Sequence, residues 1–213
     1  MKRIALLFSL FFSVFLNSVL ADGFQNFITR NGDRLMDGGS EFRFISFNIP
    51  NLHYVEDDLG FEQTMPFRFP DEFEINDALA TIHQMGGQVA RTYTLSVFKQ
   101  SEPVDTPKYI MGPGQFNEEA FKTLDRVLAL ANKNGIRLII PIVNNFKWWG
   151  GAEDYAAFRG KTRDEFWTDP QLIEDFKQTV QFVLTRKNTI SGIPYNEDKA
   201  ILAWETGNET ECP

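Results

Sequence analysis

The chain has very little of two residue types on which many active sites depend. Its 213 residues include one cysteine, Cys212, and two histidines, His53 and His83. A single cysteine excludes an intrachain disulfide and a cysteine-based metal site, and two histidines leave little material for a zinc centre or a Ser-His-Asp site. We therefore expect neither a metal nor a cofactor. In an exported protein, the lone cysteine either pairs with a partner further along the chain or is an unpaired thiol.

Long hydrophobic runs are also lacking, except at the amino terminus. There a positive pair, Lys2-Arg3, precedes an apolar run over residues 4–16, and small or medium residues occupy positions 19–21. The run is shorter than the roughly 20 residues that cross a bilayer. This pattern predicts a secretory signal over residues 1–21, in preference to a retained membrane anchor. The mature protein is then expected to be secreted, extracellular and without a membrane partner.

Positive charge is scarce as well, with 21 Lys and Arg against 29 Asp and Glu and a formal net charge of −8. Removal of the signal takes away two positive charges and no negative ones, which gives −10. An acidic surface argues against nucleic acid and anionic membranes as partners. It is compatible with a neutral polysaccharide substrate. We expect a monomer.

The remaining sequence alternates predicted strands with predicted helices. Near-continuous or alternating apolar residues predict the strands, and apolar stripes with capping residues such as Asn117, Gly135 and Asp169-Pro170 predict the helices. Pro141 weakens the third strand, because proline donates no ladder hydrogen bond. The predicted strands are 42–48, 88–94, 137–143 and 200–205, and the predicted helices are 73–85, about 118–134, and one that begins at Asp169.

Strands that alternate with helices indicate an α/β fold with a parallel sheet. A doubly wound sheet and a (β/α)8 barrel both fit. No glycine-rich phosphate loop follows the first strand, and polar and aromatic residues gather after strand ends, so we favour the barrel. Four βα units make the N-terminal half of a barrel that usually takes about 250 residues. We therefore expect a truncated (β/α)8 domain over residues 22–213, with open strand edges that favour aggregation.

The end of the fourth predicted strand carries the strongest candidate for chemistry. Glu209 follows Asn208 directly, and alternation along a regular strand would put residues 205, 207 and 209 on one face, with Gly207 leaving space beside Glu209. Glycoside cleavage with retention uses two carboxyl groups about 5 Å apart. We predict that Glu209 is the acid/base and that Asn208 binds a sugar hydroxyl. The alternative for Glu209 is a helix-capping or surface carboxylate.

Three other segments have a distinctive composition at strand ends. Arg91 closes the second strand in Ala-Arg-Thr-Tyr, residues 143–146 read Val-Asn-Asn-Phe before Gly150-Gly151, and residues 203–205 read Ala-Trp-Glu. With the Asn-Glu pair, these segments make the sequence over roughly residues 24–210 resemble glycoside hydrolase family 5, and most closely its endo-β-1,4-mannanases.

This resemblance implies a role for several of these residues. Glu209 would be the acid/base, and Arg91 would stand beside the nucleophile. The family holds that nucleophile on its seventh strand, which lies outside these 213 residues. Thr210 stands where the family commonly has proline. Arg91 has the alternative of pairing with a structural acid, and Glu205 is predicted to support the site as an inward carboxylate paired with Arg91.

Five further residues are candidates for substrate binding. Trp148 and Trp149 could stack on pyranose rings or pack the loop, and at most one is expected to face the cleft. Tyr93 contacts either substrate or core, and Asn144 and His53 are predicted to contact substrate; His83, on a helix, is taken as structural. The candidates are Asn144, Trp148, Trp149, Tyr93 and His53.

These features lead to a secreted retaining hydrolase of β-1,4-linked polysaccharide, most closely mannan, with negligible turnover by the 213 residues alone. One alternative is a non-catalytic glycan-binding truncated pseudoenzyme, and another is a β-glucanase of the same family. Asn208-Glu209-Thr210 also fits the N-glycosylation pattern. We expect Asn208 to be unmodified in the folded protein, because a glycan there would obstruct the cleft.

Overall fold

The computed structural model describes residues 23–56 and 67–210. The predicted signal over residues 1–21 and Cys212 lie outside the described residues. The strands are β1 Ile28–Asn31, β2 Arg34–Asp37, β3 Ser40–Glu41, β4 Ser46–Asn48, β5 Val55–Glu56, β6 Phe67–Arg68, β7 Val89–Arg91, β8 Ile110–Gly112, β9 Gln115–Phe116, β10 Arg137–Asn144 and β11 Ile201–Asn208. The α-helices are α1 Glu72–Gln84, α2 Glu118–Asn134, α3 Ala152–Ala157 and α4 Pro170–Thr185, and the 3-10 turns are Pro50–Leu52, Arg163–Glu165 and Tyr195–Glu197.

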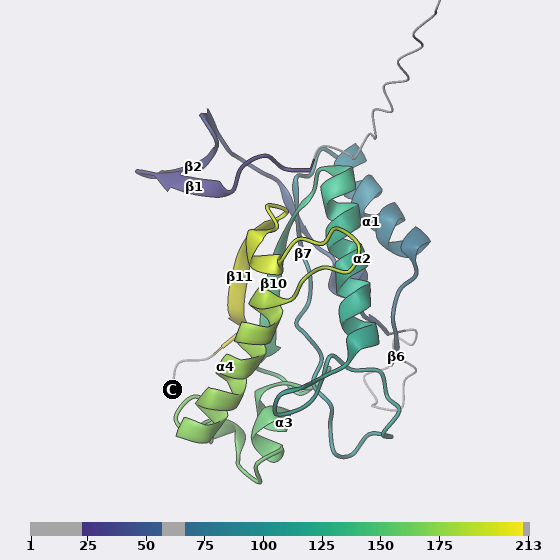
Figure 1. Ribbon diagram of the computed structural model, residues 1–213, viewed down its shortest axis with the longest axis vertical. Coiled ribbons are helices and arrows are strands. Elements are labelled where there is room, and N and C mark those ends of the chain that lie inside the picture. The colour runs from purple at the N-terminus through teal and green to yellow at the C-terminus, as the bar shows by residue number, and fades with distance from the viewer. Residues whose placement is uncertain (1–22, 57–66, 211–213) are drawn as a thin grey trace, which may run out of the picture.

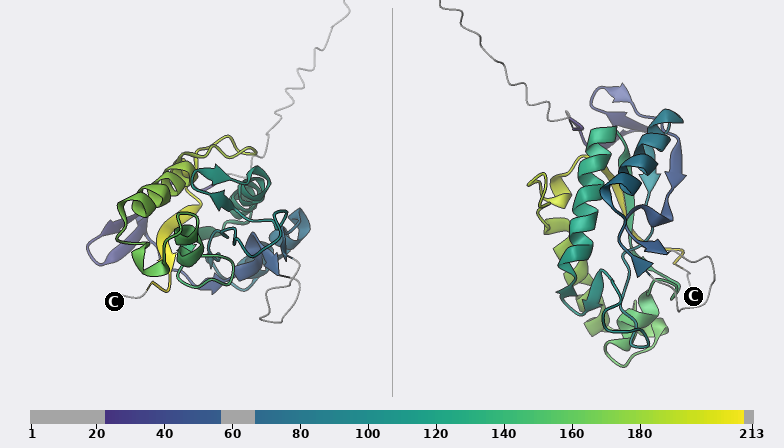
Figure 2. Two further views of the ribbon diagram at one scale, coloured as in Figure 1. Left: turned by 90° about the horizontal axis from the view of Figure 1, so that it is seen from below. Right: turned by 90° about the vertical axis from the view of Figure 1, so that its right-hand side faces the viewer.

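A four-stranded parallel sheet organises the molecule. Its order is β11-β10-β7-β4, and each neighbouring pair is parallel. The helices α4, α2 and α1 follow one another along the same side of this sheet (Figures 1 and 2). Because consecutive strands are neighbours and each crossover carries a helix, the arrangement agrees with four βα units of a barrel.

Two of the four sheet strands, β4 and β7, are shorter than predicted for a local reason. Residues 42–44 lie outside the sheet, since the Phe42 N–H donates to the Leu35 carbonyl at 2.8 Å and so continues the amino-terminal hairpin, while the Ile45 carbonyl accepts the Gln88 N–H at 3.1 Å just before β4. Residues 92–94 leave the sheet after Arg91, apart from one bond from the Thr92 N–H to the Ile139 carbonyl at 3.0 Å. The fourth strand, in contrast, is longer than predicted and reaches Asn208.

Pro141 lies inside β10 without breaking a hydrogen bond, because the pairing of β10 with β7 ends before it. The Arg137 N–H and the Ile139 carbonyl both bond toward β7, so Pro141, two residues further, faces the same side. The β7 ladder ends at the pair Ile139 and Arg91. The missing N–H of Pro141 therefore interrupts no bond to β7, while β10 continues its pairing with β11.

The three long helices have the end chemistry that their sequences predict. The Asn117 side chain accepts the Glu119 N–H at 3.0 Å at the start of α2, and Gly135 ends it with a φ of 68°. Asp169 caps α4 by accepting the N–H groups of Gln171 and Leu172 at 2.9 and 3.1 Å. The apolar stripes are buried as expected: Ile75, Leu79 and Ile82 of α1, Phe121, Leu124, Leu128 and Ala131 of α2, and Phe176 and Val183 of α4, with Val180 half-buried.

The hairpin of β1 and β2 lies at the amino ends of the parallel strands and projects beyond β11 (Figure 1). Arg137, at the start of β10, is 1% exposed and forms an ion pair with Asp37 at 2.8 Å. Its guanidinium lies 4.0 Å from the centre of the Phe24 ring. These contacts fasten the hairpin to the end of the sheet opposite the predicted site.

Candidate active site

The carboxyl ends of β7, β10 and β11 bring together four predicted site residues. Arg91 Nη2 donates to Asn208 Oδ1 at 3.0 Å, and Asn208 Nδ2 donates to Asn144 Oδ1 at 3.1 Å. Asn144 Nδ2 in turn donates to Tyr93 Oη at 3.0 Å. These residues are up to 117 positions apart in sequence. Adjacent parallel strands put them side by side because all their carboxyl ends lie at one edge of the sheet.

Glu205 and Arg91 form a bidentate ion pair at this edge. Arg91 Nη2 lies 2.6 Å from Glu205 Oε2, and Arg91 Nε donates to both carboxylate oxygens at 3.0 Å. The two side chains are 22% and 34% exposed. The predicted pairing of Glu205 with Arg91 is therefore confirmed, and the pair holds the guanidinium so that its free donor reaches Asn208.

Glu209 lies just beyond the end of β11, and its backbone differs from our expectation. Its φ is 51°, in the left-handed region, so the strand alternation that would put residues 205, 207 and 209 on one face stops at Asn208. The space beside Gly207 is also filled, because a Cβ there would lie 2.8 Å from Thr210 Cγ2 and 3.2 Å from the Val143 carbonyl oxygen. Gly207 thus permits close packing and leaves no open space. The Glu209 residue is exposed.

Tyr93 is hydrogen-bonded to the amide network and lies within reach of the charge of Glu209. The Tyr93 side chain is half-buried, and burial raises the pKa of its phenol above the ordinary value. The negative charge of Glu209 acts in the same direction on this pKa, and the charge of Arg91 opposes it. Tyr93 is therefore a neutral hydroxyl near Glu209, able to donate or accept a hydrogen bond at the surface of the site.

Trp149, His53 and Asn144 are buried, so the structure does not place them where a substrate would touch them, and the predicted substrate contacts of His53 and Asn144 are not seen. Trp149 is 3% exposed, and its ring packs edge-on against Tyr54 and Tyr93 at 4.8 Å. His53 is fully buried, and its Nε2 lies 2.9 Å from the Tyr93 carbonyl oxygen. Burial lowers the pKa of His53 to about 4, so its ring is neutral. Trp149 packs against the Tyr93 ring, and His53 binds the Tyr93 backbone. For Trp149, the alternative that it packs the loop therefore agrees with the structure.

Trp148 is the exposed member of the tryptophan pair. Its side chain is 42% exposed, and its Nε1 donates to Glu56 Oε1 at 3.0 Å. The Trp148 carbonyl accepts from Lys99 Nζ at 2.5 Å. Glu56 and Lys99 were not among the site residues predicted from the sequence. No local pattern marks Lys99, since residues 99–108 read Lys-Gln-Ser-Glu-Pro-Val-Asp-Thr-Pro-Lys and have the composition of an ordinary polar loop.

Asn208 is buried, and both the oxygen and the nitrogen of its side-chain amide form hydrogen bonds. The residue is 5% exposed, its Oδ1 accepts from Arg91, and its Nδ2 donates to Asn144. An attached glycan would break the second bond and would need space that the fold does not provide. The geometry therefore agrees with an unmodified Asn208 in the folded protein. It disagrees with the prediction that the Asn208 amide binds a sugar hydroxyl, because both ends of that amide are already hydrogen-bonded.

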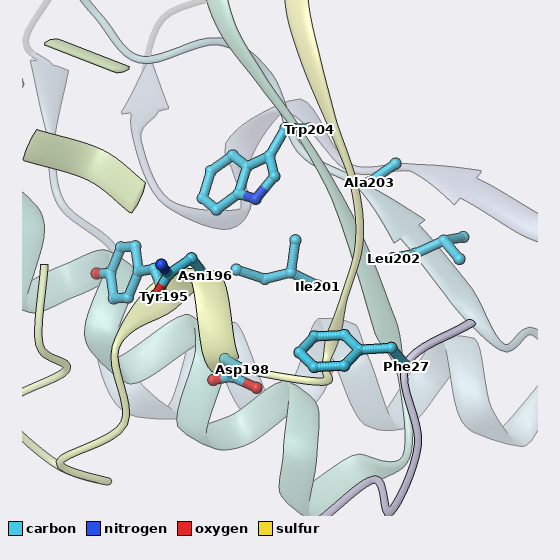
Figure 3. A pocket seen from close by; sticks show the side chains of 8 residues that line it. All are labelled: Phe27, Tyr195, Asn196, Asp198, Ile201, Leu202, Ala203 and Trp204. Carbon is cyan, nitrogen blue, oxygen red and sulfur yellow. The ribbon is translucent and has the colours of Figure 1, made fainter. Parts of the chain in front are cut away.

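Other parts of the surface offer little for the same chemistry. Within residues 23–56 and 67–210, no group of three or more His, Cys, Asp or Glu side chains is arranged to hold a metal ion. No helix in these same ranges has the length and apolarity needed to cross a membrane. A cavity of about 210 Å³ lies beside β11, lined among others by Phe27, Tyr195, Ile201 and Trp204 (Figure 3). Trp204 alternates with Glu205 along the strand, so this cavity is separate from the site.

Sequence comparisons connect this geometry to known enzymes. The profile of the family described as GH family 5 beta-mannosidase-like matches residues 25–212. Mannan endo-1,4-beta-mannosidase 4 of Solanum lycopersicum is 33% identical over 197 residues, which cover 89% of this chain and 45% of the relative. Mannan endo-1,4-beta-mannosidase 1 of Arabidopsis thaliana is 32% identical over 209 residues, covering 96% of this chain and 47% of the relative. The chain thus spans about half the length of the curated relatives it matches.

Solved structures give the same result at the level of the fold. An endo-1,4-beta-mannanase from Rhizomucor miehei superposes with a TM-score of 0.71 and 25% identity, over 88% of this chain and 49% of that one. An endo-beta-1,4-mannanase from Thermotoga petrophila gives 0.68 and 31%, over 82% of this chain and 36% of that one. The four parallel strands correspond to about half of the (β/α)8 barrel of these enzymes. Since the family profile covers nearly the whole chain, the protein belongs to glycoside hydrolase family 5, in its beta-mannosidase-like group.

Proposed function

We propose that the chain supplies the acid/base half of a retaining active site for β-1,4-linked mannan. The observation that carries this proposal is the network at the carboxyl ends of β7, β10 and β11, in which Arg91, Asn208 and Asn144 are bound to one another beside Glu209. The relatives' names add mannan as the substrate class. Glu209 would protonate the leaving oxygen and later deprotonate the water that releases the covalent intermediate.

The exposed position of Glu209 suits this role. A carboxylate that follows a strand end is carried by the sheet, while its side chain remains accessible to a ligand at the mouth. Asn208 is fixed by two hydrogen bonds and presents its backbone next to the acid/base. Glu205 is held by Arg91 through both oxygens, so we assign it to positioning and not to proton transfer.

A retaining reaction needs a second carboxylate about 5 Å from the first. Among the described residues, the other carboxylate near the end of β11 is Glu205, and both of its oxygens are bound by Arg91. We therefore propose that the 213 residues bind mannan but turn it over negligibly by themselves. Release of reducing ends from galactomannan by the purified chain would contradict this part of the proposal.

A chimera tests the acid/base role directly. Residues 25–210 would replace the matching segment of the Solanum lycopersicum relative, which supplies the rest of a barrel. We expect hydrolysis of galactomannan to exceed that of carboxymethyl cellulose, and Glu209→Gln to lower kcat by about 10²–10⁴-fold, the usual contribution of a general acid/base.

The exposed carboxylate Glu197, which precedes β11, provides the matched control. Glu197→Gln should leave kcat unchanged. Activity that survives Glu209→Gln in a chimera with native circular dichroism would refute the role of Glu209. A preference for carboxymethyl cellulose would refute mannan as the substrate while leaving the acid/base role intact.

A further inference from the structure

Trp148 is 42% exposed, yet hydrogen bonds hold both its side chain and its backbone. The indole Nε1 donates to Glu56 Oε1 at 3.0 Å, across 92 positions of sequence. The Trp148 carbonyl accepts from Lys99 Nζ at 2.5 Å. One contact orients the ring and the other fixes the backbone, so both the position and the tilt of the exposed ring are determined.

The lysine that fixes the backbone belongs to a buried charge cluster. Lys99 and Lys108 lie 3.5 and 3.1 Å from the same oxygen of Glu102, and the three side chains are 5%, 0% and 5% exposed. Lys108 also lies 4.4 Å from the centre of the Phe67 ring. Removing three charges from water is unfavourable, and apolar residues of similar size would often stabilise a fold equally well. The cluster is therefore better explained by the geometry that it imposes than by its contribution to stability.

The backbone around Trp148 has no room to move relative to this cluster. The Val97 N–H donates to the Trp149 carbonyl at 3.0 Å. Gly150 has a φ of 82°, and a Cβ on it would lie 1.9 Å from the Val97 carbonyl oxygen. Segment 148–150 is consequently pressed against segment 97–99, and Lys99 is directly beside the carbonyl that it binds.

The held ring belongs to the same edge of the sheet as the candidate site. Trp148 follows Asn144 at the end of β10, and the adjacent Trp149 packs against Tyr93 at 4.8 Å. Tyr93 is hydrogen-bonded to Asn144, and the charge of Glu209 raises the pKa of its phenol. An indole presents a flat apolar face, which complements the C–H face of a pyranose ring. A ring already fixed in orientation loses little conformational freedom when a sugar binds.

We propose that Trp148 is a pyranose-binding platform of this site, and that Glu56 and the Lys99–Glu102–Lys108 cluster are positioning residues that set the orientation of its ring. This inference rests on the proposed glycan-binding function, which it extends to a named contact. The ligand is a sugar unit of the polysaccharide beside the bond that Glu209 would act on.

A first experiment examines the ring without any sugar. The chain has four tryptophans, and each indole N–H gives one peak in a ¹H–¹⁵N spectrum. Glu56→Leu removes the acceptor and should shift the Trp148 peak, whereas Glu56→Gln keeps an acceptor oxygen and should largely restore it. Lys99→Met should also shift this peak and leave that of Trp167 in place. An unchanged Trp148 peak in both Glu56→Leu and Lys99→Met would overturn the positioning role.

A second experiment measures binding of mannohexaose to the 213-residue chain by calorimetry. Trp148→Ala should weaken the affinity at least about tenfold. Trp167 is the matched control, since it is also 42% exposed but packs near the start of α4 against Phe166 and Phe176. Trp167→Ala should bind like the wild type. Glu56→Leu should weaken binding more than Glu56→Gln.

The outcomes separate this inference from the proposed function. Wild-type binding that is equal in Trp148→Ala would overturn the platform while leaving the function of the site intact. No binding of mannohexaose by the wild-type chain would overturn the platform and, with it, the proposal that the 213 residues bind mannan. The role of Glu209 would then be judged by the chimera alone.

Discussion

At the scale of single residues, buried polar side chains determine how the site is held. His53 lies behind Tyr93, with its Nε2 2.9 Å from the Tyr93 carbonyl and its ring fully buried. Because a carbonyl only accepts hydrogen bonds, this nitrogen carries the proton of a neutral imidazole. The same burial that removes His53 from the substrate makes it a support for the backbone of a site residue, and it makes stability depend on pH.

The pH dependence follows from the two states of His53. Burial lowers its pKa from 6.5 in the unfolded chain to about 4 in the folded one. Below pH 6.5 the unfolded chain therefore binds a proton that the folded chain does not, and stability falls as the pH drops from 6.5 toward 4. The expected loss is about 3 kcal/mol over this window. Urea unfolding at several pH values should show a shallower dependence for His53→Gln than for the wild type.

The exposed histidine of α1 gives the comparison for this experiment. His83→Gln should keep the wild-type dependence, since the side chain is exposed on the helix. A His53→Gln variant with the same pH dependence as the wild type would show that His53 does not contribute to acid sensitivity.

At the scale of secondary structure, the helices attach to the sheet through both their apolar stripes and their ends. Arg186, just after α4, binds Asp125 of α2 at 2.7 Å and Glu118 at 2.9 Å, and Tyr195 Oη donates to Asp125 at 2.5 Å. This network joins the end of α4 to both the start and the middle of α2. Asn117 caps the start of α2 through a separate hydrogen bond, which can be removed by a single substitution.

Substitution of the α2 cap should lower stability by a defined amount. Asn117→Ala removes the acceptor of the Glu119 N–H, now at 3.0 Å, and should cost about 1 kcal/mol. For a domain of this size, the thermal midpoint should fall by about 2–4 °C. Asn117→Asp keeps an acceptor oxygen next to the helix start and should unfold close to the wild-type midpoint. Equal losses in the two variants would contradict the capping role.

At the scale of the whole molecule, the four-stranded sheet has two open edges. β11 and β4 are its outer strands, and Ala203 and Thr206 of β11 and Ser46 and Asn48 of β4 are exposed. Unpaired strand edges present hydrogen-bonding groups to other chains. The sequence predicts a monomer, whereas these edges favour association of the 213-residue chain.

Charge placed on the β11 edge should reduce such association. In sedimentation velocity at rising concentration, we expect the wild-type chain to form larger species and the double variant Ala203→Lys, Thr206→Lys to form fewer. The control is Gln178→Lys with Gln181→Lys, which adds the same charge to exposed positions of α4. If both double variants behave alike, net charge and not the strand edge governs association.

The sequence by itself determined the order of strands and helices, the helix caps and the strand ends that carry chemistry. These features depend on local patterns: apolar periodicity, a capping side chain such as Asn117, a left-handed glycine such as Gly135. The pairing of Glu205 with Arg91 was also predictable, because an inward carboxylate requires a cation and Arg91 closes another strand of the same predicted sheet.

Only the tertiary structure decided which aromatic and polar residues are exposed. Trp148 and Trp149 are neighbours in sequence, yet one is 42% and the other 3% exposed, because the loop after β10 packs against residues 97–99 and the aromatic cluster of Tyr54 and Tyr93. The left-handed backbone of Glu209 and the buried Lys99–Glu102–Lys108 cluster likewise depend on long-range packing. The exposed fraction of a side chain depends on packing partners that are far away in the sequence, so a local pattern does not predict it.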